Sequence, residues 1–497
     1  MSLTRRQLHK LGFLGGAALV LPRSMTGGAL GLSGRGSTKP LSRGLASPRV
    51  MPFTRPLIIP PVLVPEYSED ALDFYRVTMQ QAEVEIIPGT TTTIWGYNGL
   101  YPGPTIRARS GRRVVVRQQN RLPESMSVHL HGGHTPPSSD GHPYHLVAPG
   151  ADKDYDYPNN QIPTTLWYHD HAVDATGRHV YMGLAGFYIM TDDYEDSLPL
   201  PKGDNDVPLM IQDRLFNANG SLNYPLTDET IVTGVVGDTV LVNGVVQPYY
   251  EVGTRKMRFR ILNGSNARSY RLALSSGQRL TQIGSDGGLL SQPASRASIS
   301  LFPGERIDIV IDFSGYPLGT RVVLRDLFED ETSLGNVLEF RVTREEPDDS
   351  CVPETLRYVD PIPESSATTT RTFTLDERVI NGRTLFTING RLFDPTYVDA
   401  RPRLNDVEIW RFVNTSAYQL HPIHIHDIEW QILDINGRRP PPGDDGWKDV
   451  FSVPFHSTVR VIGRFVDLTG TYVFHCHKLE HEDHAMMAQF EVLPAKD

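Results

Sequence analysis

Cysteine is scarce in this chain of 497 residues, which contains only Cys351 and Cys476. The number is too small for the disulfide frameworks that hold small secreted domains together. Cys476 lies between two histidines, an arrangement typical of a metal ligand. If Cys476 binds a metal, Cys351 has no partner, so no intrachain disulfide is expected.

Dense basic runs and long apolar runs are also missing. The net charge of −10 argues against nucleic acid as a partner. The apolar run at residues 11–21 is too short to span a bilayer, so no stable membrane insertion is expected. Arg5 and Arg6 precede this run, and the combination resembles a bacterial twin-arginine signal; a disordered basic tail is the alternative. We therefore expect a leader over residues 1–50, unstructured to about Arg49, and export by the twin-arginine machinery to the periplasm or the cell exterior.

Glycine and proline, by contrast, are plentiful, with 43 and 38 residues, which favours many short strands joined by turns. Helical periodicity is scarce, and residues 172–184 form one of few short candidates. Residues 56–65 are apolar and proline-rich, which excludes a helix or an inner strand. We expect them to strap an extended segment over another domain.

An internal repeat divides the chain. Asn-Gly pairs begin at positions 98, 243 and 389, and each leads to an alternating strand that ends in asparagine. One Asn-Gly signal is weak, but three at spacings of 145 and 146 residues, with matching strands, indicate three similar domains. Domains of this size with turns throughout favour Greek-key β-sandwiches, so the predicted fold class is all-β. The predicted domain boundaries are 51–195, 205–345 and 367–497.

Histidine is missing from the middle repeat, because none of the 17 histidines lies between His179 and His421. The middle repeat is therefore predicted to be a spacer, while metal chemistry uses the first and third repeats. Elsewhere, histidines two residues apart on a strand point two imidazoles the same way. An isolated pair more often consists of surface histidines or of hydrogen-bonded histidines in a core, but four pairs in two of three repeats favour metal sites. The clusters are His129 and His131; His169 and His171; His421, His424 and His426; and His475 and His477.

The closing segment, residues 473–486, combines ligand types that favour copper. Cys476 with His481, Met486 and one further histidine matches the ligand set of a blue-copper site. Residues 470–474 are predicted to be a strand, so His475 and His477 would face away from Cys476, towards a second metal site. One short segment would then connect two metal centres through covalent bonds.

These motifs resemble those of multicopper oxidases, the family of laccases, bilirubin oxidases and related three-domain bacterial enzymes. The resemblance extends from about residue 74 to residue 493, and segments 166–171 and 475–483 look closest to bacterial spore-coat-type laccases and bilirubin oxidases. It implies three consecutive cupredoxin-like domains and four copper ions per chain, with every ligand position filled. Type 1 copper would be bound by His421, Cys476, His481 and axial Met486; type 2 copper by His129 and His424; one type 3 copper by His131, His169 and His477; and the other by His171, His426 and His475.

The resemblance also implies an activity, in which four one-electron oxidations of phenolic or aryl-amine donors are coupled to reduction of dioxygen to two waters. Glu482 and Asp140 match acids that the family places near the copper cluster, and we predict that they assist proton delivery; surface charge is the alternative. Donors are expected to approach the type 1 copper through exposed imidazoles of His421 and His481.

Three alternative functions belong to the same resemblance. Bilirubin oxidases typically carry a tryptophan two residues before the first type 1 histidine, where this chain has Gln419, so that assignment is weakened. No Met-rich insert of the kind seen in periplasmic cuprous oxidases occurs, which makes metal-ion oxidation a lesser alternative. A copper-free structural or cell-division homologue would require missing ligands, and none is missing.

Overall fold

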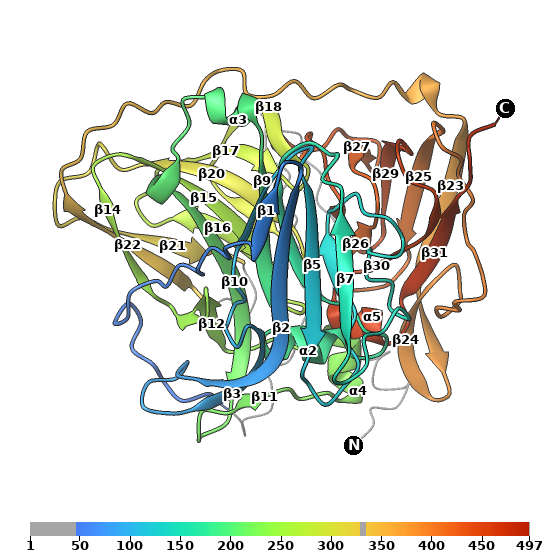
Figure 1. Cartoon of the computed structure of the whole chain (residues 1–497), viewed down its shortest axis with the longest axis horizontal. Coiled ribbons are helices and arrows are strands. Elements are labelled where there is room, and N and C mark those ends of the chain that lie inside the picture. Colours follow the sequence, from blue (N-terminus) through green and yellow to red (C-terminus); the bar gives the residue numbers. More distant parts are fainter. Residues whose placement is uncertain (1–45, 329–333, 497) are drawn as a thin grey trace, which may run out of the picture. The chain divides into compact units, whose positions relative to one another are not determined.

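The computed structural model describes residues 46–328 and 334–496, which are almost entirely strands and loops (Figure 1). The strands of these residues form six sheets, and the sheets follow one another along the chain in three pairs. We call the pairs the first sandwich (residues 67–191), the middle sandwich (206–344) and the third sandwich (369–492). The all-β prediction is confirmed.

The first sandwich packs a sheet of order β1-β2-β5-β7, with β3 beside β2, against a sheet of order β4-β9-β8-β6. Alternating side chains of β5 are buried, as expected for a strand with one face on the core. Its elements are β1 (Tyr67–Glu69), β2 (Leu72–Val84), β3 (Thr92–Tyr97), β4 (Ile106–Arg109), β5 (Arg113–Asn120), β6 (Val128–His131), β7 (Asp152–Tyr157), β8 (Thr165–Asp170), α2 (Thr176–Met182) and β9 (Ala185–Thr191), followed by α3 (Asp193–Ser197).

The middle sandwich has the largest sheet, β13-β12-β10-β15-β20-β17-β18 with β11 beside β10, and a second sheet β14-β22-β21-β16-β19. Its elements are β10 (Asp206–Phe216), β11 (Leu222–Asn223), α4 (Asp228–Thr233), β12 (Thr239–Val242), β13 (Val245–Val246), β14 (Tyr249–Gly253), β15 (Lys256–Asn263), β16 (Tyr270–Leu274), β17 (Leu280–Ser285), β18 (Gly288–Arg296), β19 (Ile299–Leu301), β20 (Arg306–Asp312), β21 (Arg321–Asp326) and β22 (Asn336–Arg344).

The third sandwich packs the sheet β24-β23-β25-β29-β27 against the sheet β28-β26-β30-β31. Its buried core contains Cys476 and Met486 beside aromatic and aliphatic side chains. Its elements are β23 (Thr369–Ile380), β24 (Arg383–Ile388), β25 (Val407–Asn414), β26 (His421–Ile425), β27 (Trp430–Ile435), β28 (Val450–Val453), β29 (Ser457–Arg464), β30 (Gly470–Cys476), α5 (Leu479–Asp483) and β31 (Met487–Val492).

The three Asn-Gly turns have the same conformation and the same hydrogen bond. Both residues of each turn have positive φ, 49–54° for asparagine and 68–79° for glycine, a conformation that these two residues adopt more readily than others. In every turn the asparagine side-chain oxygen accepts a 2.8 Å hydrogen bond from a backbone N–H of the neighbouring strand. The alternating strand to which each turn leads, namely β5, β15 or β25, pairs in parallel with the first long strand of its sandwich. The sandwiches are therefore equivalent units, while the predicted domain boundaries remain predictions.

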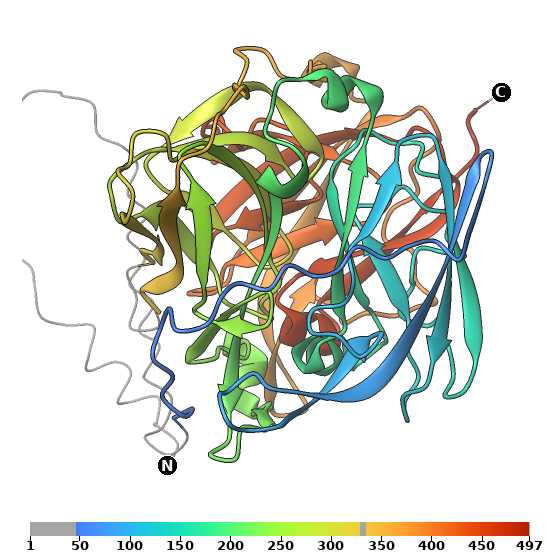
Figure 2. The ribbon, with the colours of Figure 1, turned by 60° about the vertical axis from the view of Figure 1, so that its left-hand side comes forward.

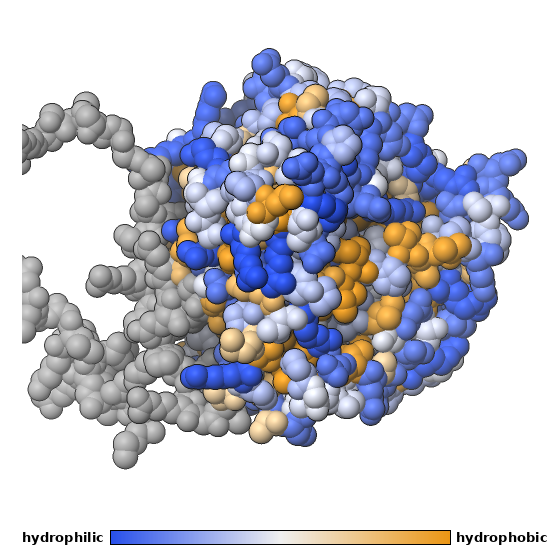
Figure 3. Space-filling model, turned by 90° about the vertical axis from the view of Figure 1, so that its left-hand side faces the viewer, coloured by the Kyte–Doolittle hydropathy of each residue, from blue (hydrophilic) through white to orange (hydrophobic). Residues whose placement is uncertain are grey.

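The predicted strap, residues 56–65, is extended and joins two sandwiches (Figure 2). The Leu57 N–H donates to the Tyr249 carbonyl at 2.7 Å, and the Leu63 N–H donates to the Thr105 carbonyl at 2.8 Å. Leu57 is buried in the core of the middle sandwich. Hydrophobic residues lie among hydrophilic ones on the face drawn in Figure 3. Four strap residues are exposed, Ile58, Ile59, Val62 and Val64.

The predicted leader falls mostly outside the described residues, because the twin-arginine motif and its apolar run lie within residues 1–45. The part that is described corrects the prediction of an unstructured segment up to about Arg49. The Ser47 N–H donates to the Asp238 carboxylate at 2.9 Å, and Ser47 Oγ accepts from the Phe216 N–H at 2.9 Å. Within residues 46–328 and 334–496, no helix is long and apolar enough to cross a membrane.

Candidate metal centre

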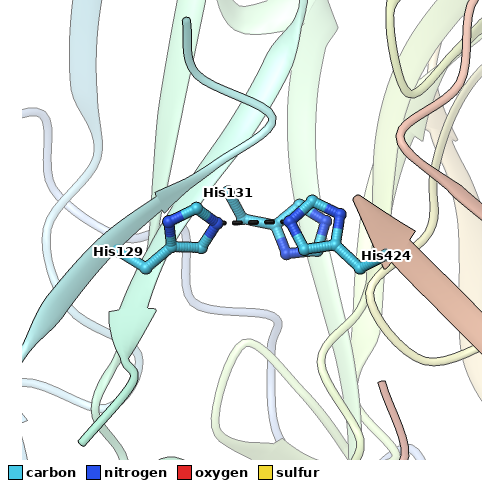
Figure 4. A group of neighbouring side chains, drawn as sticks. All are labelled: His129, His131 and His424. Atoms are coloured by element: carbon cyan, nitrogen blue, oxygen red, sulfur yellow. Dashed lines mark hydrogen bonds between the residues drawn. The ribbon is translucent and has the colours of Figure 1, made fainter. Parts of the chain in front are cut away.

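Histidines from the first and third sandwiches meet between the two sandwiches. In the first sandwich, β6 and β8 are neighbours, and His129 lies opposite His169 in their register. In the third sandwich, β26 and β30 are neighbours, and His424 lies opposite His475. The His131 and His424 rings stack across the boundary with centroids 3.6 Å apart. Figure 4 shows His129 and His424 pointing towards one another from opposite sides.

All predicted histidine ligands and Cys476 fall into four buried groups. Within each group, one nitrogen or sulfur atom per residue lies within 4.8 Å of the others. We call the eight-histidine assembly the histidine cluster, and the group that contains Cys476 the thiolate group. The groups are His129, His131 and His424; His131, His169 and His477; His171, His426 and His475; and His421, Cys476 and His481.

The ring nitrogens of the histidine cluster point towards one another, and hydrogen bonds between the rings do not pair all of them. The His129 and His424 Nε2 atoms are 3.2 Å apart, and His475 Nε2 lies 3.1 Å from His171 Nε2 and 3.3 Å from His426 Nε2. Other buried ring nitrogens of the cluster have no hydrogen-bond partner, namely His131 Nδ1, His169 Nε2, His171 Nδ1 and both nitrogens of His477. Converging neutral imidazoles form a donor set that suits copper, so the residues fit a group of metal ions.

Asp140 holds two of these rings from outside. Its carbonyl lies 2.5 Å from His129 Nδ1, and its carboxylate lies 2.9 Å from His426 Nδ1. These contacts place the ring hydrogens on Nδ1 and leave each Nε2 lone pair directed into the cluster. Asp140 is itself fully buried, which excludes the surface-charge interpretation.

Asp449 holds two further rings, and the middle sandwich holds Asp449. The Asp449 carboxylate accepts from His131 Nε2 at 3.0 Å, and its carbonyl accepts from His424 Nδ1 at 2.9 Å. Arg306, from the first residue of β20, is fully buried and donates through both terminal nitrogens to the Asp449 carboxylate, at 2.6 and 2.5 Å. The spacer prediction is therefore incomplete, because a residue of the middle sandwich orients a ligand of the cluster through Asp449.

Glu482 lies on the other side of the cluster. Its carboxylate is 3.0 Å from His475 Nδ1 and 3.6 Å from His171 Nε2. Burial by itself raises the pKa of the Glu482 carboxyl, but the adjacent His475 and His171 hold that pKa well below its usual range. Glu482 also lines a cavity of about 250 Å³, together with residues such as Tyr144, Thr176 and Phe393. A buried carboxylate therefore lies between a cavity and the cluster.

Burial sets the protonation state of the cluster histidines. It lowers the pKa of His171 to about 3 and that of His424 to about 4. The pKa values of the other cluster histidines for which a shift is resolved are lowered by the same cause. Because only the neutral imidazole binds a metal, the folded chain presents these ligands in their binding form at neutral pH.

The thiolate group has an apolar setting. The Nδ1 atoms of His421 and His481 each lie 3.5 Å from the Cys476 sulfur, and the Phe386 ring packs against both imidazoles at centroid distances of 4.8 and 4.5 Å. Met486 is buried in the same core, and its carbonyl accepts from the Cys476 N–H at 3.1 Å. Burial raises the pKa of the Cys476 thiol to about 12, so a thiolate here requires a bound cation.

The predicted exposure of the two imidazoles is wrong. His421 is fully buried and His481 is 2% exposed. His481 is covered by a segment of the middle sandwich around α4, whose Val232 carbonyl accepts a 3.0 Å hydrogen bond from His481 Nε2. Gln419, at the position where bilirubin oxidases carry tryptophan, is buried and accepts from the Lys478 ammonium at 2.6 Å.

Asp170, between His169 and His171, has a structural role. Its carboxylate accepts from the backbone N–H groups of Ser127 and Ala172 at 3.0 and 3.1 Å, and it lies 2.7 Å from His179 Nδ1. These bonds fix the segment that carries His169 and His171. Sequence reasoning missed Asp449, Arg306 and Val232, because each acts through a partner far away in the chain and lies in no local motif.

Comparison with known proteins identifies the family. A model of multicopper oxidases matches residues 78–195, and a second matches residues 358–496, so that together they span more than half of the chain. The chain belongs to the multicopper oxidase family. Its structural relatives confirm the cupredoxin-like fold, and the family binds copper, which the histidine cluster and the thiolate group fit.

Relatives of this multicopper oxidase include enzymes with different names. A laccase of Bacillus stratosphericus is 37% identical over 89% of this chain and 99% of its own. A bilirubin oxidase of Albifimbria verrucaria is 36% identical over 90% of this chain and 83% of its own. The crystal structure of a laccase from Pediococcus acidilactici matches with a TM-score of 0.82 and 34% identity, covering 90% of this chain and 95% of that one. The chain is therefore a copper-dependent oxidoreductase that uses oxygen.

Proposed function

We propose that this multicopper oxidase is laccase-like, and couples four one-electron oxidations of phenolic or aryl-amine donors to reduction of dioxygen to two waters. The observation that supports the proposal is a buried thiolate group beside eight converging imidazoles. Laccases among the relatives support the donor class.

Copper bound at the two regions would supply one-electron transfer at the thiolate group and four-electron dioxygen reduction at the histidine cluster. In this proposal His421, Cys476, His481 and Met486 hold type 1 copper, and His129 and His424 hold type 2 copper. His131, His169 and His477 hold one type 3 copper, and His171, His426 and His475 hold the other.

The chain supplies the connection between the two regions. Cys476 belongs to the thiolate group, while its covalent neighbours His475 and His477 belong to the histidine cluster. Alternation along the end of β30 sends these side chains to opposite sides. Electrons can therefore cross from Cys476 to the histidine cluster by two routes, one peptide bond to His475 or one peptide bond to His477.

Glu482 and Asp140 are proposed to manage protons. Both are buried carboxylates that contact cluster imidazoles, and Glu482 also borders the 250 Å³ cavity. Reduction of one dioxygen to two waters consumes four protons, so a carboxylate between solvent and the cluster is a suitable carrier. Asp140 also orients His129 and His426.

Oxygen uptake tests the proposal. Copper-loaded protein with a panel of phenols and aryl amines is expected to show the intense colour of thiolate-bound copper and to consume dioxygen. Colourless protein, or coloured protein that consumes no dioxygen with any donor of the panel, would contradict it. The colourless result would favour the copper-free structural alternative.

The alternatives within the family have specific obstacles. Gln419 is bonded to Lys478 and lacks the aromatic surface expected for a bilirubin oxidase. A cuprous oxidase needs a metal-ion site near the thiolate group, and no Met-rich segment lies in this sequence. Including bilirubin and cuprous ions in the same panel tests both alternatives directly.

Export remains a proposal as well. The twin arginine at residues 5–6 and the short apolar run after it support export through the twin-arginine route to the periplasm or beyond. Fractionation of cells that produce the chain, with a variant in which both arginines are lysines, tests this; an unchanged distribution would contradict the proposal.

A further inference from the structure

The segment that buries His481 comes from the middle sandwich, which supplies none of the ligand groups found among the described residues. It comprises residues 224–235, and we call it the cover. Helix α4 lies inside the cover and begins with a capping box, in which Thr227 and Thr230 satisfy each other's backbone N–H groups. The Val232 carbonyl accepts the His481 Nε2–H at 3.0 Å, and the Val232 side chain packs against the core of the third sandwich. The Nε2 edge of His481, which faces away from Cys476, is thus covered by the backbone of the cover.

Both ends of the cover are fastened to one buried carboxylate. Glu480, the neighbour of His481, is fully buried and accepts from the Tyr224 hydroxyl at 2.9 Å and from the Val235 N–H at 3.0 Å. Asn266 Nδ2 donates to the same carboxylate at 2.8 Å. Glu480, which holds the cover, is the direct neighbour of His481, so the cover keeps its position over His481.

A third contact joins helix α4 to β24, the strand that contains Phe386. Asp228 pairs with Arg383 of β24 at 3.3 Å, although this pair is exposed and adds little stability. The buried contacts of Glu480 and Val232 therefore carry the attachment. Because the cover is attached at both ends and at its centre, it must unfold locally before a donor can reach His481.

We propose that the cover prevents donors from touching His481, so that electrons enter this oxidase through the Val232 carbonyl and its hydrogen bond to the imidazole. The inference rests on the proposed function and deepens it. Donors would be selected by reduction potential at the outer face of the cover, and neither a hydrogen bond to His481 nor a snug pocket would contribute. Each phenol would lose one electron to the chain and one proton to solvent; four such losses supply the electrons and protons that convert one dioxygen to two waters.

Chemical labelling of histidine tests the cover without any reaction of the enzyme. Diethyl pyrocarbonate acylates the lone-pair nitrogen of an accessible neutral imidazole, so the labelling uses copper-free protein, in which no metal ion binds His481. Peptide mapping compares His481 with His145, which is exposed. We expect His481 to react at least ~10-fold more slowly, equivalent to about 1.4 kcal/mol of local opening. Equal labelling of the two residues in the wild-type protein would overturn the inference.

A variant with a flexible cover provides the second arm. Residues 228–233 are replaced by a Gly-Ser segment of equal length, which keeps Tyr224 and Val235 but removes the helix. Labelling of His481 is expected to rise at least ~10-fold, because local opening no longer requires the helix to unfold. Glu229→Gln, an exposed change on the same helix, is the matched control and is expected to leave labelling unchanged. Unchanged labelling in a copper-free Gly-Ser variant that folds, and that becomes coloured when copper is added, would also overturn the inference.

Two phenols of equal reduction potential, one with bulky groups beside the hydroxyl, complete the test. The wild-type protein is expected to oxidise both with similar kcat/KM, and the Gly-Ser variant is expected to favour the small phenol. A wild-type preference of ~10-fold or more, about 1.4 kcal/mol, would contradict selection by potential. If neither phenol is oxidised, the proposed function fails while the labelling still decides about the cover. If the Gly-Ser variant does not fold, the wild-type labelling and the phenol pair are sufficient.

Discussion

The thiolate group and the histidine cluster are joined by single peptide bonds but have opposite surroundings. Phe386 and the apolar core of the third sandwich enclose the thiolate group, and a backbone carbonyl is the partner of its outer imidazole. Carboxylates surround the histidine cluster, namely Asp140, Asp449 and Glu482. The difference matches the chemistry proposed for each region, because one exchanges electrons alone while the other must also receive protons.

The middle sandwich contacts the two regions by different means. At the thiolate group it supplies the cover, in which the Val232 carbonyl accepts a hydrogen bond from His481 Nε2. At the histidine cluster it supplies Arg306, which holds Asp449 and through it His131. A sandwich without histidine therefore closes one region against donors and orients the ligands of the other.

Removal of the Cys476 thiolate should have the largest effect, because it disables the thiolate group and leaves the histidine cluster in place. Cys476→Ser is expected to abolish the colour and to lower donor oxidation by more than ~100-fold, since even outer partners of a metal ligand are worth about 10–100-fold. The histidine cluster should still bind copper. Cys351→Ser, at the exposed second cysteine, is the control and should change neither property. Copper content and visible absorption measure the outcome; a coloured Cys476→Ser protein would contradict the assignment.

Glu482→Gln should separate the two regions next most strongly. Dioxygen reduction is expected to slow by about 100-fold, the lower end for a positioned proton carrier, while the colour of the thiolate group stays intact. Stopped-flow mixing of the reduced protein with dioxygen measures the rate. Glu480→Gln is a matched control two residues away, because Glu480 contacts the cover and none of the cluster histidines. Loss of colour in Glu482→Gln would refute the division of labour.

Arg306→Lys should weaken the histidine cluster alone. Lysine cannot bind the Asp449 carboxylate through two parallel hydrogen bonds, so copper affinity at the cluster is expected to fall by about 10–100-fold. Competition with a chelator measures it, with the colour of the thiolate group as an internal reference. Arg258→Lys, another buried arginine of the middle sandwich that pairs with Glu195, is the control for general destabilisation. Equal copper loss in both variants would assign Arg306 a purely structural role.

The smallest expected effect lies outside both regions. His134 of the first sandwich lies 2.5 Å from Glu429 and 3.3 Å from Asp467 of the third. Burial opposes protonation, but the two carboxylates raise the pKa of His134 well above 6.5. Because the folded pKa is the higher one, this stabilisation is complete below the unfolded pKa and is lost as pH rises through the folded value. His134→Gln should lower the free energy of unfolding by about 1–3 kcal/mol near pH 6, and by less at alkaline pH.

Urea titrations at several pH values measure this difference, with His145→Gln at the exposed histidine as the control. Both regions should keep their copper and colour in His134→Gln. A difference between wild type and variant that grows with pH would contradict the assigned charge state of His134.

The sequence predicted what depends on local pattern. The three Asn-Gly pairs mark three turns with the same φ values and the same hydrogen bond, so the repeat is readable from residue spacing alone. Alternation on strands placed His475 and His477 apart from Cys476, and the structure brings each into a different group. Short-range geometry is sufficient for such statements.

Contacts between distant parts of the chain could not be predicted in this way. His481 and Val232 are separated by 249 positions, and Arg306 and Asp449 by 143. Neither pair has a periodicity or motif that indicates it, because its formation depends on how the sandwiches pack. The predicted exposure of His481 failed for this reason, and so did the description of the middle repeat as a spacer.

The stoichiometry of oxygen consumption tests the central claim most directly. In one vessel, the dioxygen consumed, the phenol oxidised in one-electron steps and the hydrogen peroxide released are measured together for the copper-loaded protein. The account predicts four phenol oxidations per dioxygen and no peroxide. Two oxidations per dioxygen with an equivalent of peroxide would contradict it, since the histidine cluster would then fail to complete the reduction to water.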